Sequence, residues 1–332
     1  MMQEVPFYTK KQIKSLNSDQ IHSMKTQMGE ITFDEVVQLN ILREKINARS
    51  THLAVADRLV VTRPMQGLEA QIFATDSAVN SVYPVSPDSI GVKERSPPVK
   101  YNKIDASLYM AETRWMISDD AKLRGAWQWT VDDTRERAAQ SLAVQKDNHV
   151  LTQLKAAAPA GNDVTAANTW DSANGDVEGD IAKAIGKIVD NSDITQTELE
   201  QDQAFAVVMP AKAYSAIQKL KLIRNINDTV KNFIQTEYKV RVFFSRKPRN
   251  DPAFSTWPVA TEALILPIQN RALGFLGTFD GGGVVPAQIR KRLDRGEEII
   301  NHQWFRYTAI PQPFDGTVTT NAMIAKIGSV VA

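Results

Sequence analysis

The sequence predicts an α+β protein, and three observations indicate this class. A proline-rich stretch at 79–98 is followed by a segment at 104–110 in which apolar and polar residues alternate. One long helical segment comes next, at 131–158. Alternating helices and strands and a strand-rich tail complete the chain, and no catalytic motif interrupts this order. Helices and sheets in such an order form layered architectures, so the chain has the pattern of a scaffold.

Composition narrows the class of protein. The 332 residues suffice for one large or two modest domains, and 43% hydrophobic residues are enough for a real core. Lys+Arg 39 against Asp+Glu 38 leaves a net charge of +1, which argues against a dedicated nucleic-acid binder but allows one face toward nucleic acid. Without cysteine, disulfides and thiolate metal sites are excluded. With no signal-peptide pattern and no apolar run near ~20 residues, we expect a soluble protein without a membrane partner.

Residues 1–62 are expected to form a helical arm. Ile21, Met24 and Met28 recur at helical spacing, and residues 32–35 form a capping box ahead of a second amphipathic helix. Such an arm either packs on its own domain or extends to a neighbouring subunit.

Residues 63–117 are expected to be extended. Prolines exclude a continuous helix there, and the two-residue alternation at 104–110 predicts a half-buried strand. The stretch at 79–98 suits an exposed ribbon, which is either an interaction arm or a disordered liability. We favour the arm, because an exposed ribbon edge pairs readily with another chain. The candidate inter-subunit residues on it are Val82, Tyr83, Val85, Ile90 and Val92.

The long helix at 131–158 is expected to begin after Trp129, with Thr130 or Asp132 as its cap. A helix of this length spans ~42 Å at 1.5 Å per residue. The alternative is two shorter helices with a break at 146–149. The apolar stripe of the long helix comprises Ala138, Leu142, Leu151, Leu154 and Ala158.

Residues 177–269 are expected to form a compact α/β unit. The predicted elements are a helix capped by Asp176 or Asp180, a strand at 205–209, a helix from Pro210 to Leu220, a helix at 226–238, and strands at 240–244 and 263–266. Strands at 299–310 and 322–327 follow in the tail. We expect the strands before and after the long helix to pair beneath it and to form a discontinuous second domain.

The sequence shows no catalytic, cofactor or metal motif. The four histidines, His22, His52, His149 and His302, are scattered and lack metal-ligand spacing, so solvated or locally bonded imidazoles are expected. The glycines at 281–283 lack the lysine of a phosphate-binding loop, and no nucleophile elbow is present. We therefore assign no catalytic residue, no cofactor and no metal, and expect a protein that is not an enzyme.

Two basic clusters are the strongest candidates for a surface that faces nucleic-acid phosphates. They comprise Lys10, Lys11 and Lys14 near the N-terminus and Arg290, Lys291 and Arg292 in the tail. Such side chains neutralise phosphates without reading base sequence. The alternative is an ordinary solvated surface, in which they pair with acids such as Asp294 and Glu297.

With its elements in this order, the chain resembles the major capsid proteins of tailed viruses, the Hong Kong phage capsid fold, which encapsulins share. The resemblance runs from about residue 79 to residue 332, and it lies in pattern and order. The segments that carry it are the ribbon ahead of Tyr101, residues 116–123, residues 130–158, Trp170 with residues 179–185, and residues 206–214, 240–245, 263–266 and 299–310.

The resemblance implies four parts: an N-terminal arm at 1–62, an E-loop with flanking strands at 63–117, a P-domain at 118–176 and 270–332 that contains the spine helix at 131–158, and an A-domain at 177–269. It implies pentamers and hexamers that tile an icosahedral shell around packaged double-stranded DNA. The shell would be assembled in the host cytoplasm and belong to the virion, with scaffold, portal or decoration proteins as further partners.

Two alternatives remain. An encapsulin would build the same shell around a protein cargo and hold little nucleic acid. A small-molecule enzyme would use the α/β segment as a pocket, and it would need polar groups clustered around a cleft.

Overall fold

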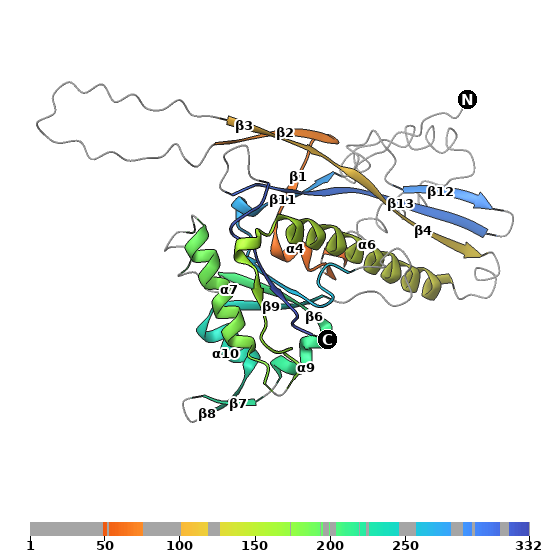
Figure 1. Cartoon of the computed structure of the whole chain (residues 1–332). Coiled ribbons are helices and arrows are strands. Elements are labelled where there is room, and N and C mark those ends of the chain that lie inside the picture. The colour runs from red at the N-terminus through yellow and green to blue at the C-terminus, as the bar shows by residue number, and fades with distance from the viewer. Residues whose placement is uncertain are drawn as a thin grey trace, which may run out of the picture.

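The computed structural model describes residues 49–75, 101–118 and 127–331, apart from positions 52, 173, 193, 195–198, 200–203, 219, 224–225, 246–256, 280–287, 294–295 and 313–318. Two five-stranded sheets and one long helix, α6, dominate this part of the chain, and two two-stranded ladders accompany them (Figure 1). The α+β class predicted from the sequence is confirmed. In the described residues, no helix is both long and apolar enough to cross a membrane.

The first sheet joins strands from both sides of α6, as predicted. Its members are β1 (Val61–Pro64), β4 (Tyr109–Ser118), β11 (Gly274–Phe279), β12 (Gln288–Leu293) and β13 (Gly296–Ala309). The long strand β13 is central. It is antiparallel to β4 along one side and to β12 and then β11 along the other. The parallel strand β1 extends the sheet beyond β11.

Helix α6 (Trp127–Ala157) packs against β4 and β13 and is continuous. The alternative of a break at 146–149 is therefore wrong. The predicted start is also wrong, because the helix already includes Trp129, Thr130 and Asp132, which we expected to precede or cap it. No proline or glycine lies between Trp127 and Asp132, so nothing in the backbone stops the helix from starting earlier. Pro159 follows its end, as predicted.

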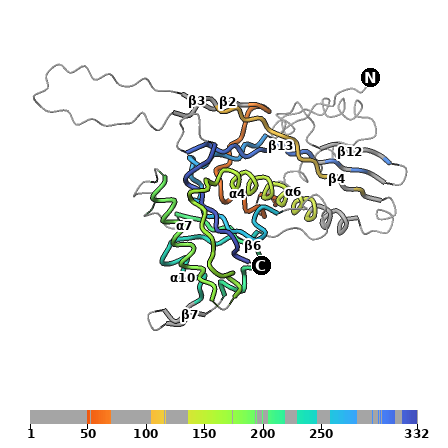
Figure 2. The backbone as a smooth tube through the Cα atoms, in the orientation of Figure 1, coloured from red at the N-terminus to blue at the C-terminus, as the bar shows by residue number. Residues whose placement is uncertain are grey.

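The second sheet has the order β5-β14-β10-β6-β9. These strands are β5 (Val164–Thr165), β14 (Ala325–Gly328), β10 (Ala263–Pro267), β6 (Phe205–Pro210) and β9 (Val240–Ser245). Helices α7 (Val177–Asn191) and α10 (Val230–Glu237) lie along it (Figures 1 and 2). Asp176, one of the two predicted caps, begins α7 by accepting a hydrogen bond from the Gly179 backbone N at 3.1 Å. Strands β5 and β14, which lie outside 177–269 in the sequence, also belong to this sheet.

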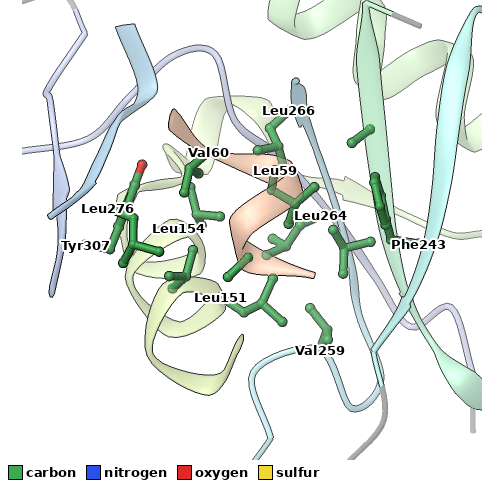
Figure 3. Close-up of a cluster of buried hydrophobic side chains, with 14 of the residues drawn as sticks. Leu59, Val60, Leu151, Leu154, Phe243, Val259, Leu264, Leu266, Leu276 and Tyr307 are labelled. Carbon is green, nitrogen blue, oxygen red and sulfur yellow. The ribbon is translucent and has the colours of Figure 1, made fainter. Parts of the chain in front are cut away.

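Strand β6 is buried on both faces and separates two hydrophobic cores. Ala206 and Val208 belong to the core that α6 and the first sheet share, and Phe205, Val207 and Met209 belong to the core under α7 and α10. A strand covered on both faces reads as an unbroken apolar run, which is why 205–209 was recognisable in the sequence. Figure 3 shows the first core, where Leu59 and Val60 meet Leu151, Leu154, Leu264 and Leu266.

Two predicted helices are shorter in the structure. After β6, a short 3-10 turn η3 (Ala211–Ala213) and the single helical turn α9 (Tyr214–Ile217) replace the helix expected up to Leu220. Leu220 instead begins β7 (Leu220–Ile223), which pairs with β8 (Ile226–Thr229). The helix expected at 226–238 therefore starts only at Val230, where Thr229 Oγ1 accepts a hydrogen bond from the Asn232 N at 3.2 Å.

The predicted strand at 104–110 divides between two ladders. Its first part belongs to β3 (Tyr101–Ser107), which pairs with β2 (Glu69–Thr75), and its last part opens β4. At the junction, the Leu108 N donates to the Leu68 O at 2.8 Å, where the chain crosses to the first sheet. The ribbon at 79–98 and most of the N-terminal arm lie outside the described residues. The remaining short elements are α4 (Ala56–Leu59), η2 (Ala160–Asn162) and η5 (Arg271–Leu273).

Candidate assembly surface

Strand β4 forms an edge of the first sheet. In the part of the chain that the structure describes, β13 is the one strand that pairs with β4, which places β4 at the edge of the sheet among the described strands. With ten residues it is long for an edge strand. Such an edge offers hydrogen bonds to an extended segment of another chain. The edge is therefore the first component of a candidate assembly surface.

Exposed methionines lie on the same strand. Met110 and Met116 are 48% and 61% exposed, whereas Ala111 and Thr113 between them are buried. Because alternate residues of a strand point to opposite faces, the two methionines lie on the face away from α6. Two large apolar side chains exposed on one strand are unusual for a surface that stays in water, and methionine adapts well to a partner surface.

A charged group lies between the two methionines. The Glu112 carboxylate accepts a hydrogen bond from Arg114 and lies 3.3 Å from His302 Nε2, and Arg114 also lies 3.8 Å from Glu298. The hydrogen bond from Arg114 is the main cause that lowers the pKa of Glu112. The strip thus places two charged side chains between two apolar ones, an arrangement that sets the register of a contact more than its strength.

A cavity of about 390 Å³ runs beside this edge, between β4 and α6. Its lining residues are Tyr109, Met110, Ala111 and Glu112 from β4 and Gln145, Asn148, His149 and Thr152 from α6. A backbone edge, apolar side chains and amide groups in one groove are suited to an extended peptide, because the edge pairs its backbone and the groove receives alternate side chains.

His149 is a structural residue at the base of the groove. Its ring packs against Tyr109 with centroids 4.9 Å apart, and its Nε2 accepts a hydrogen bond from the Tyr307 N at 3.1 Å. Burial, with a smaller contribution from Arg306, lowers the pKa of His149 to about 4. The imidazole is therefore neutral at pH 7. The expectation of locally bonded histidines is confirmed for His149 and for His302, which lies against Glu112.

The structure describes only part of the predicted site residues. Arg290, Lys291 and Arg292 lie on β12, and their register partners on β13 are Ile299, Glu298 and Glu297. The phosphate-facing role of these three residues stays a prediction. The remaining predicted residues, Lys10, Lys11, Lys14, Val82, Tyr83, Val85, Ile90 and Val92, lie outside the described residues.

The edge, the groove and the methionines were not recognised in the sequence. The alternation at 104–110 indicated a strand here, but it did not show that the strand continues to Ser118. Edge position depends on which strands pair, and a single strand carries no signal of that. The one available signal was Met116, a large apolar residue two positions from the polar residues Arg114 and Ser118, which would share its face of a strand.

Comparison with known proteins identifies structures with a similar fold. No family model and no curated protein matches the sequence. A phage-related protein from Bordetella bronchiseptica RB50 matches the structure at a TM-score of 0.57 and 12% identity, over 88% of this chain and 97% of that one. A chain from Mycobacterium phage Bobi matches at a TM-score of 0.53 and 13% identity, over 83% of this chain and 90% of that one. The capsid of an empty GTA particle matches at a TM-score of 0.50 and 9% identity, over 82% of this chain and 95% of that one.

At these identities the likeness establishes the fold. The chain has the major capsid fold of tailed viruses, and the fold predicted from the order of its elements is confirmed.

Proposed function

We propose that the protein is a viral major capsid protein that assembles into an icosahedral shell around double-stranded DNA. The observation that carries the proposal is that the capsid fold extends over 88% of this chain and 97% of the phage-related chain from Bordetella. The position of β4 at the edge of the described sheet and its exposed methionines support it, because a shell subunit needs surfaces that a neighbour can cover. The role is structural, without catalysis.

In this role, the four parts named from the sequence would be an N-terminal arm at 1–62, an E-loop with flanking strands at 63–117, a P-domain at 118–176 and 270–332, and an A-domain at 177–269. The ladder of β2 with β3 supports the second part, because Thr75 pairs with Tyr101 and residues 76–100 thus begin and end at one point. Strands β5 and β14 pair in the same sheet as β10, β6 and β9, which supports placing them beside the A-domain in this proposal.

The subunit would make its contacts through two kinds of surface. The proposed inter-subunit residues Val82, Tyr83, Val85, Ile90 and Val92 would reach a neighbour from the E-loop. The β4 strip, with Met110 and Met116, would receive a neighbour on the P-domain. Many modest contacts, closed by pentamer and hexamer symmetry, would make the shell more stable than any one interface.

Packaged DNA would be held without sequence recognition. Lys10, Lys11 and Lys14 are the proposed phosphate-facing residues of the arm, and Arg290, Lys291 and Arg292 are those of β12. The shell would belong to the virion and form in the host cytoplasm, with scaffold, portal or decoration proteins as further partners.

The content of purified particles tests the proposal. Particles from infected or producing cells are treated with nuclease, and the protected nucleic acid is then extracted and sized. A capsid protects long double-stranded DNA from digestion. Particles that hold a protein cargo and almost no nucleic acid would instead identify an encapsulin compartment and overturn the viral role.

A further inference from the structure

Three ionisable side chains meet at the junction of the short helix α4 and the long helix α6. Lys146 Nζ of α6 lies 3.3 Å from Asp57 Oδ2 of α4, and their side chains are 1% and 4% exposed. Thr62 donates a hydrogen bond to the other oxygen of Asp57 at 3.4 Å. Such a pair is costly to bury unless the charges satisfy one another, so its presence between two helices requires an explanation.

A second carboxylate joins the pair from α6. Asp147 Oδ1 accepts a hydrogen bond from the Ala56 N, the first residue of α4, at 2.8 Å. The residue at the N-cap of α4, Val55, has no side chain that could accept this bond. Asp147 thus supplies from another helix the acceptor that a capping residue normally provides.

The cluster holds two acids and one base. When all three groups are ionised, it carries an excess negative charge in a place that water barely reaches. Burial therefore raises the pKa of Asp147 to about 7, and the charge of Asp57 adds to this, whereas the hydrogen bonds from Ala56 and Val55 and the charge of Lys146 oppose it. Burial also raises the pKa of Asp57, against the attraction of Lys146. One extra proton makes the cluster neutral.

The surrounding elements hold few groups that compete for that proton. From β13, Phe305 lies with its ring centroid 6.0 Å from Lys146 Nζ, and His302 is engaged by Glu112. From α4, the neighbouring Arg58 is exposed. Asp57, Lys146, Thr62 and His302 are among the residues that line a cavity of about 510 Å³ beside the cluster.

We propose that Asp57, Lys146 and Asp147 form a proton-controlled latch, which holds α4 on α6 when the cluster carries one extra proton and loosens when that proton leaves. The latch thus controls how firmly α4 is held on α6. The latch is a property of one subunit and does not depend on whether the protein forms shells.

The direction of the pH effect follows from the two states of Asp147. A docked carboxyl has a pKa of about 7, and a solvated one returns to 3.8. Docking is therefore most favourable below the solvated value, weakens as pH rises between the two values, and becomes constant above the docked value. The ratio of docked to undocked α4 should fall about tenfold per pH unit in that interval.

Hydrogen exchange of the full-length protein tests the latch. Protection factors, in which the intrinsic pH dependence of exchange is divided out, are measured at pH 5, 6, 7 and 8 for a peptide covering 54–60. In the wild type, protection should fall about tenfold per unit from pH 5 to 7 and then level off. A peptide covering 205–210 in the buried strand β6 reports global opening and should not follow this slope.

Two variants separate the latch from other causes. Asp147→Asn keeps an acceptor for the Ala56 N but cannot ionise, so its protection should not vary between pH 5 and 7. Glu136→Gln removes an exposed carboxylate of the same helix that binds Arg49, and it should keep the wild-type slope. Flat protection in the wild type, or an equal slope in Asp147→Asn, would overturn the proposal.

A further variant covers the case in which Asp147→Asn fails to fold. Asp57→Asn removes the repulsion on Asp147 and leaves it alone with Lys146. The levelling-off of protection should then move to lower pH than in the wild type. An unchanged or higher pH of levelling-off would contradict a shared proton.

Discussion

Gly274 shows how a single residue permits a junction that its neighbours require. It ends η5 and begins β11 with a φ of 125°, a conformation that residues with a side chain rarely adopt. A Cβ at this position would lie 2.1 Å from the Thr308 O of the paired strand β13. Both the backbone angle and the close approach therefore require glycine, and together they align β11 with β13.

Two glycine substitutions should shift stability in opposite directions. Gly274→Ala should lower the free energy of unfolding by about 1–3 kcal/mol, because of backbone strain and the clash with Thr308. Gly186→Ala lies inside α7 with open space around it and should raise the free energy by about 0.5–1 kcal/mol. Urea unfolding followed by circular dichroism measures both. A Gly274→Ala variant as stable as the wild type would show that the η5–β11 junction tolerates a side chain.

The latch residues mark the limit of sequence reasoning at this scale. Lys146 lies four residues after Leu142, a spacing that places it on the buried side of α6. The sequence offered no partner for it, since Asp57 is 89 residues away. The sequence left open a break in the helix at 146–149, whereas in the structure the charged Lys146 lies buried inside the protein beside Asp57. A buried lysine is recognisable only when its acid is known.

At the scale of elements, the predictions succeeded where the apolar residues repeat with a single spacing, either that of a strand or that of a helix. The apolar runs at 205–209 and 263–266 and the stripe of α6 have a single period, and all are formed. The segment at 210–229 failed, because its apolar residues at Ile217, Leu220 and Ile223 also suit a helix. In the structure this segment contains the antiparallel pair β7 and β8, and the sequence of one strand does not show which strand pairs with it.

Strand β4 carries the prediction that belongs to this scale. Met116→Glu should weaken assembly strongly, because it places a charge where a neighbouring subunit is expected to cover an apolar side chain. Met116→Leu keeps the apolar character and should assemble as the wild type does. The free energies of unfolding of the two monomeric variants in urea should agree within about 0.5 kcal/mol, since exposed substitutions act weakly on folding. Analytical ultracentrifugation measures the assembled fraction.

The result for Met116→Glu decides what the strip does. Normal assembly of this variant would show that β4 remains open to solvent in the shell. Loss of folding in Met116→Glu but not in Met116→Leu would show that the methionine stabilises its own subunit. Neither outcome fits an assembly surface.

At the scale of the molecule, two sheets share one core and so behave as a plate. Strand β6 contributes to both cores, and α6 with α4 fills the space between the sheets (Figures 1 and 3). The order of elements was sufficient to predict this architecture, because strands on both sides of α6 had to pair beneath it. The contribution of β14 to the second sheet was not predictable, since it comes from the far end of the chain.

The central claim is that this plate joins edge to edge with copies of itself. Electron microscopy of the purified protein at increasing concentration tests it most directly. We expect rings, tubes or closed shells whose fraction rises with concentration, as symmetric contacts of modest strength require. A protein that stays monomeric at every concentration would contradict the claim.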